Sequence, residues 1–120
     1  MKRTLILGAS PNPERYAHKV TLKLSKYGHP VFPVGLRKGN IGDHEILTDQ
    51  PLIENIDTLT LYVGPKNQPV YYDYILNKIK PQRIIFNPGT ENEELINLAQ
   101  QQHIETEVAC TLVLLSVDEY

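Results

Sequence analysis

The chain has 120 residues, a formal net charge of −2 at pH 7, and 22% charged residues. That length predicts one domain, over residues 1–120, able to bury about two-thirds of its unfolded surface, and the near-neutral charge predicts no binding to nucleic acid or to an anionic membrane. The longest apolar stretch falls short of the ~20 residues that cross a bilayer, and the apolar run after Lys2 and Arg3 is too short for a secretory signal, so we expect a cytoplasmic protein.

The first predicted element is a short apolar strand over residues 4–7, which runs into a turn of small residues, Gly8, Ala9 and Ser10. At the end of a parallel strand, such a turn lets the backbone approach an anion, which the N–H groups and dipole of the next helix attract. The dinucleotide fingerprint G-x-G-x-x-G is incomplete, because Ser10 and Pro13 stand at its second and third glycine positions. An ordinary strand turn is the alternative interpretation.

Apolar residues at helical spacing predict a helix that Gly28 ends: Ala17, Val20, Leu24 and Tyr27. A second strand follows over 30–34, and Pro33 places it near a sheet end or edge. We then expect a loop over 35–42, a very short strand over 45–48 and a single turn over 51–55.

The second half repeats this alternation, with a strand over 58–63, a loop over 64–69 and a helix over 69–80 that Pro81 ends. Residues expected to face inward on that helix are Tyr72, Ile75, Leu76 and Ile79. A strand over 83–86 leads to a turn over 87–93, where Thr90 and Glu93 have capping-box spacing for the next helix. His103 closes that helix, and a last strand over 104–108 precedes a helical segment over 110–116.

Apolar strands that alternate with helices predict an α/β fold: a single Rossmann-like, doubly wound parallel sheet of five to six strands with helices on both faces. We expect the strand order 3-2-1-4-5 with right-handed crossovers. A ligand would then lie across the carboxyl ends of the strands, where the first and fourth-encountered strands diverge. Three turns should converge there, over residues 8–15, 35–38 and 64–67.

The loop after the second strand indicates which nucleotide would bind. An NAD-binding domain usually carries Asp or Glu there, whereas this chain has Arg37 and Lys38. Two neighbouring cations suit a ribose that carries its own phosphate, as in NADP or coenzyme A. A solvated basic loop is the alternative.

Four ordered segments together resemble the small stand-alone CoA-binding proteins, and the resemblance spans essentially the whole chain. They are GASPNPERY at 8–16, TLTLYVGPKNQ at 58–68, FNPGTEN at 86–92 and EVACTLV at 107–113. That family is similar in fold to the CoA-binding domain of the succinyl-CoA synthetase alpha subunit. The chain shares with the family the lack of the second and third glycines, and it departs from many relatives in having Gly35-Leu36 where they have Asn-Pro.

The resemblance implies that a group of first-turn residues surrounds the CoA pyrophosphate: Gly8, Ala9, Ser10, Asn12 and Arg15. It also implies that the loop of Gly35, Leu36, Arg37 and Lys38 approaches the 3′-phosphoadenosine, and that Val63, Gly64 and Pro65 border the adenine and the upper pantetheine arm. The predicted binding set is completed by Tyr16, Asn67, Gly89, Thr90 and Asn92, and Tyr71 could stack on a ligand.

No metal site is predicted, because the four histidines and the single cysteine lack zinc-ligand spacing. No catalytic residue is predicted either. The glutamates at 91, 93 and 94 suit the positive end of a helix, and the phosphorylated histidine of the synthetase belongs to a separate domain. Cys110 is either an inert core thiol or a neighbour of the pantetheine thiol that forms a mixed disulfide. We therefore predict non-catalytic binding of coenzyme A or an acyl-CoA. The alternatives are an NADP-dependent reductase and a nucleotide-fold regulatory protein that docks a partner through apolar residues at 112–117.

Overall fold

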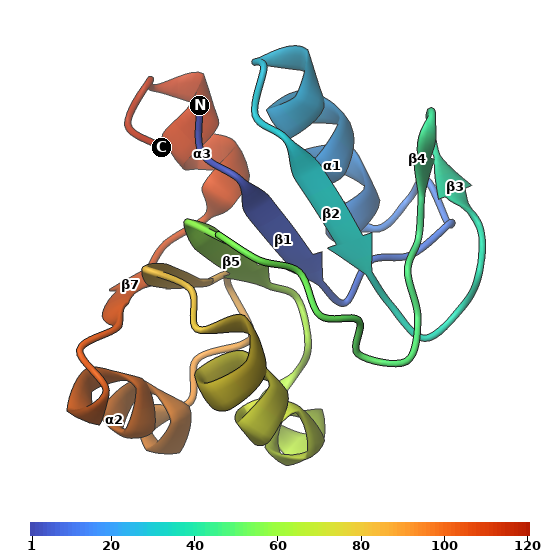
Figure 1. Cartoon of the computed structure of the whole chain (residues 1–120). Coiled ribbons are helices and arrows are strands. Elements are labelled where there is room, and N and C mark those ends of the chain that lie inside the picture. The colour runs from blue at the N-terminus through green and yellow to red at the C-terminus, as the bar shows by residue number, and fades with distance from the viewer.

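The computed structural model describes all 120 residues and is built on a five-stranded sheet in the order β2-β1-β5-β6-β7 (Figure 1). Every pairing in this sheet is parallel. The strands are β1 (Thr4–Leu7), β2 (Val31–Val34), β5 (Thr58–Leu61), β6 (Arg83–Phe86) and β7 (Glu105–Val108). The Rossmann-like α/β fold is thus confirmed, and the strand order reverses direction between β1 and β5.

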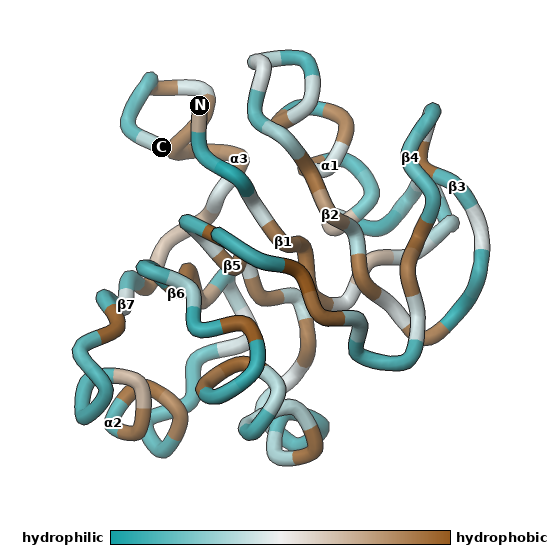
Figure 2. The backbone as a smooth tube through the Cα atoms, in the orientation of Figure 1, coloured by the Kyte–Doolittle hydropathy of each residue, from teal (hydrophilic) through white to brown (hydrophobic).

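Helices cover both faces of the sheet, as expected. Helices α1 (Tyr16–Lys26) and α3 (Thr111–Ser116) pack on one face around a core that includes Ile6 and Val20. On the other face, η3 (Tyr74–Ile79) and α2 (Glu93–Gln101) enclose the larger core, which includes Leu59 and Ile84. Figure 2 shows the matching pattern, with hydrophobic residues along the central strands. No helix in the fold has both the length and the apolar character that a bilayer crossing requires.

The region expected as a third strand is organised differently. A two-stranded antiparallel hairpin, β3 (Asn40–Ile41) with β4 (His44–Glu45), stands where a loop and the start of the strand over 45–48 were expected. Only Leu47 reaches the sheet, through a single parallel bridge to Val34 on the outer edge of β2. The strand order therefore agrees with the expected 3-2-1-4-5, except that the third strand along the chain is reduced to this single bridge.

The prediction of one regular helix over residues 69–80 is wrong, because this stretch forms short segments of other helix types. Prolines begin two short 3-10 turns, η1 (Pro65–Asn67) and η2 (Pro69–Tyr71), and a π-helical segment, η3, follows. The Lys80 amide donates to the Ile75 carbonyl oxygen at 3.0 Å, five residues back, and Lys80 ends the segment with φ of 51°. The wider turn changes the inward face, so Tyr74 is fully buried and Tyr72 only partly, while the other three expected residues are buried.

Three smaller expectations also need correction. The cap of α2 is Asn92, whose side-chain oxygen accepts from the Glu94 and Leu95 amides, and the Thr90–Glu93 capping box does not form. Strand β5, which was expected to run to residue 63, ends at Leu61. Tyr27, expected to be inward, is 43% exposed because it lies beyond the end of α1.

Candidate functional site

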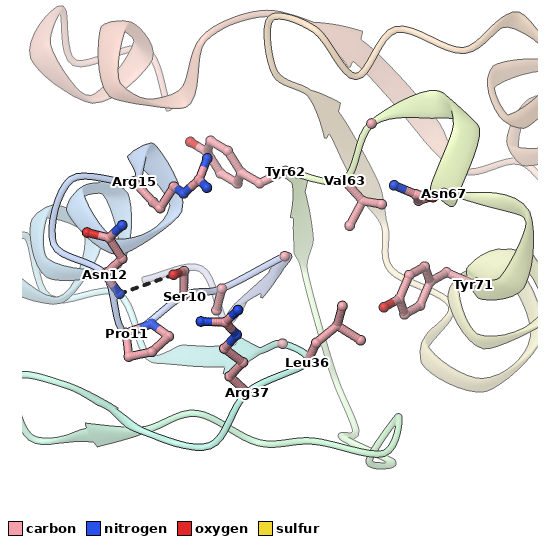
Figure 3. A pocket seen from close by; sticks show the side chains of 14 residues that line it. Ser10, Pro11, Asn12, Arg15, Leu36, Arg37, Tyr62, Val63, Asn67 and Tyr71 are labelled. Carbon is pink, nitrogen blue, oxygen red and sulfur yellow. Dashed lines mark hydrogen bonds between the residues drawn. The ribbon is translucent and has the colours of Figure 1, made fainter.

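A cavity of about 500 Å³ lies at the carboxyl ends of β2, β1 and β5, where the strand order reverses (Figure 3). The three turns that were expected to converge all line it. The lining residues are Gly8, Ala9, Ser10, Pro11, Asn12, Arg15, Gly35, Leu36, Arg37, Tyr62, Val63, Gly64, Asn67 and Tyr71.

Close backbone contacts hold the turn after β1 in place. Gly8 has φ of +100°, and a Cβ atom there would stand 2.8 Å from the Tyr62 carbonyl oxygen. The amides of Gly8 and Ala9 both donate to the Val34 carbonyl oxygen, at 3.0 and 2.9 Å. A Cβ atom on Gly35 would overlap the Ala9 carbonyl group, with its carbon 3.1 Å away. Glycine at 8 and 35 therefore lets three strand ends approach closely around one space.

The segment between this turn and α1 is organised by its own polar groups. The Asn12 amide donates to Ser10 Oγ at 3.1 Å, and the Glu14 amide donates to Asn12 Oδ1 at 3.0 Å. The buried His18 ring donates from Nδ1 to the Ser10 carbonyl oxygen at 2.9 Å, since that oxygen can only accept. The Ser10 hydroxyl accepts a hydrogen bond from the backbone amide of Asn12, so its own proton remains available to donate to a ligand.

The start of α1 and two arginines make this cavity electropositive. The first helical amides, those of Tyr16 and Ala17, make no hydrogen bond within the chain, and the first turn of α1 has no acidic residue. The single salt bridge of the structure joins Arg83 to Glu107, so Arg15 and Arg37 are both unpaired. In Figure 3 the Arg15 side chain extends toward Tyr62, whereas Arg37 comes from the loop after β2. No acidic side chain lines the space, which can therefore hold a ligand with several negative charges.

The turn after β5 supplies the opposite wall. Val63, Gly64 and Asn67 line the cavity together with Tyr71, the aromatic residue expected to stack on a ligand. Burial raises the pKa of Tyr62 well above its ordinary value, so its phenol stays protonated and can donate a hydrogen bond.

Six residues of the predicted set lie outside this cavity: Tyr16, Lys38, Pro65, Gly89, Thr90 and Asn92. The side chains of Thr90 and Asn92 have structural partners. The Thr90 hydroxyl donates to the Asn87 backbone carbonyl oxygen at 2.8 Å. The side-chain amide of Asn92 donates from Nδ2 to Gln68 Oε1, also at 2.8 Å. The sequence reasoning missed Pro11 and Tyr62. Tyr62 could have been found from its place directly after a buried strand, where side chains face the ligand edge.

A second cavity, of about 240 Å³, adjoins the first and shares Tyr62 with it. Its other lining residues are Tyr16, Asn87, Pro88, Cys110 and Leu112. Cys110 is half-buried and faces this space, so it is not a fully enclosed core thiol. Nowhere in the structure do three His, Cys, Asp or Glu side chains gather as metal ligands would.

Comparison with known proteins finds the same fold and a family. A crystal structure of an uncharacterized protein is 48% identical, with 100% of this chain and 98% of that one covered and a TM-score of 0.97. A hypothetical protein from Pyrococcus horikoshii OT3 is 25% identical, with coverages of 93% and 80% and a TM-score of 0.82. A Thermus thermophilus structure, 22% identical with coverages of 99% and 91%, shares the fold at a TM-score of 0.84. No curated protein matches the chain. Residues 2–116 match the family described as a CoA binding domain, and the chain therefore belongs to that family.

Proposed function

We propose that this protein binds coenzyme A, free or acylated, in the 500 Å³ cavity and catalyses no reaction there. The observation that carries the proposal is the meeting of two unpaired arginines in one space without an acidic residue, beside the start of α1, whose first amides are unpartnered. The pyrophosphate binds at the turn between Gly8 and Arg15, and the 3′-phosphate binds Arg37. Membership of the CoA binding domain family supports the choice of ligand.

The lining of the cavity also supports binding without catalysis. It contains no histidine, cysteine or carboxylate, so no side chain there can serve as a general base near neutral pH. An NADP-dependent reductase would use the same phosphate contacts, so NADPH fluorescence on addition of protein is measured as well.

Calorimetry with CoA and dephospho-CoA tests the position of the 3′-phosphate. A charge-assisted hydrogen bond contributes about 1.5–3 kcal/mol, so we expect CoA to bind at least about tenfold more tightly than dephospho-CoA. Arg37→Ala should remove most of that preference. Lys78→Ala, which removes an exposed cation outside the cavity, should preserve it.

Two results would contradict parts of the proposal. Equal affinities of wild type for the two ligands would refute the assignment of the 3′-phosphate to Arg37. An increase in NADPH fluorescence on adding protein, with no competition by CoA, would favour the reductase instead.

A further inference from the structure

The smaller cavity lies beside the proposed CoA site along the same edge of the sheet. Its lining comes from the ends of β5, β6 and β7, through Tyr62, Asn87 and Cys110, and from the start of α1 and α3. Tyr62 lines both cavities, and Tyr16 directly follows Arg15, which lines the larger one. The two spaces are therefore neighbours across a single side chain.

The charged groups of the larger cavity set the direction in which a bound CoA would extend. CoA is a linear molecule with the 3′-phosphate at one end, the thiol at the other and the pyrophosphate between them. Arg37 follows β2, and the pyrophosphate turn follows β1. The thiol end must then extend away from β2, past Tyr62, toward the ends of β6 and β7, where the smaller cavity lies.

The walls of the smaller cavity suit an apolar group. Asn87 is its only amide side chain, and all its hydrogen-bonding capacity is used internally. Asn87 Nδ2 donates to Thr60 Oγ1 at 2.7 Å and to the Leu61 carbonyl oxygen at 2.9 Å, and Oδ1 accepts from the amide and hydroxyl of Thr111, both at 2.9 Å. The remaining walls are aromatic, aliphatic or thiol groups, and the only other side-chain oxygens are the hydroxyls of Tyr16 and Tyr62.

We propose that this smaller cavity holds the acyl chain of a short-chain acyl-CoA, so that the protein selects acylated over free CoA. The inference rests on the proposed function, since the larger cavity must first bind the nucleotide. A chain carbon takes up about the 30 Å³ that a water molecule occupies, so a volume of 240 Å³ corresponds to roughly eight carbons. Each methylene removed from water tightens binding by up to about fourfold.

Calorimetry with CoA and with acetyl-, butyryl-, hexanoyl- and palmitoyl-CoA tests this size limit. We expect affinity to rise from CoA to hexanoyl-CoA, by about tenfold or more in total, and to rise no further with palmitoyl-CoA. Equal affinities for CoA and hexanoyl-CoA would overturn the inference while leaving CoA binding intact. A continued rise to palmitoyl-CoA would also overturn it, because the chain would then gain contacts beyond this cavity. Failure of every ligand to bind would instead refute the proposed function.

A variant that fills the cavity locates the acyl chain. Cys110→Phe should reduce the ratio of hexanoyl-CoA to CoA affinity to about one, with each affinity measured on the same variant. Val113→Phe is the matched control, because Val113 lies in α3, the helix that Cys110 immediately precedes, is 55% exposed and lies outside the cavity. It should keep the wild-type ratio, and an unchanged ratio in Cys110→Phe would contradict the assignment.

A measurement on wild type remains decisive if Cys110→Phe does not fold. Cys110 is the only cysteine, so alkylation by iodoacetamide reports on this cavity alone. At saturating ligand, and with iodoacetamide in large excess over the thiol of free CoA, hexanoyl-CoA should slow alkylation at least about fivefold more than CoA does, in proportion to its occupancy of the cavity. Equal protection by the two ligands would overturn the proposal.

Discussion

The close approach of two strand ends predicts that Gly35→Ala destabilises the protein severely. The added Cβ atom would overlap the Ala9 carbonyl group and stand 3.4 Å from Ile46 Cγ2. Because the main obstacle is backbone, no side-chain rotation can relieve the overlap, and the turn after β1 must move. Overpacking of this kind costs about 1–3 kcal/mol, and a rigid obstacle places this case near 2–3 kcal/mol of unfolding free energy.

For a chain of this length, that loss lowers Tm by about 4 °C per kcal/mol, so we expect a decrease of about 8–12 °C in a melt followed by circular dichroism. Urea unfolding should show a lower midpoint with an unchanged m-value. Gly64→Ala is the matched control for stability, because a Cβ atom there meets nothing within 4 Å and its φ is −64°. It should melt at or slightly above the wild-type temperature. A Gly35→Ala protein within about 2 °C of wild type would show that the two strand ends are not in contact.

Three further predictions concern single side chains. Arg15→Ala should weaken CoA binding about tenfold or more by calorimetry, whereas Lys26→Ala at the other end of α1 should not, and equal effects would indicate only a general charge attraction. Burial raises the pKa of Tyr74 to about 12, so the folded state keeps a proton that the unfolded state loses near pH 10, and stability should fall as pH rises from about 10 to 12. Urea unfolding of Tyr74→Phe should show a shallower fall over that range, and an identical slope would contradict the assignment. The Cys110 thiol should react with iodoacetamide in native buffer, although more slowly than in urea. With CoA disulfide it should form a CoA-sized adduct and release one molecule of CoA with a free thiol. A native protein inert to both reagents would place Cys110 in the core.

Local patterns in the chain were enough to predict the sheet and the edge at which the larger cavity lies. The apolar runs at 4–7, 58–61 and 83–86 are fully buried strands, and their alternation with helical spacing implies parallel pairing. The turn of small residues that begins at Gly8 and the pair of cations that begins at Arg37 could also be recognised in the sequence. Turn chemistry and charge are properties of a few adjacent residues.

Other features depend on which distant segments meet, and only the folded chain decided them. The π-helical form of residues 74–79 places Tyr74 in the core, where its hydroxyl donates to the Pro51 carbonyl oxygen at 2.6 Å, 23 residues away. Asn92 rather than Thr90 caps α2, because the Thr90 hydroxyl is taken by the Asn87 carbonyl oxygen. The need for glycine at 35 arises from the Ala9 carbonyl group, on a different strand end. Helical spacing and capping motifs describe neighbours along the chain, whereas a side chain's final partner is set by packing across the sheet.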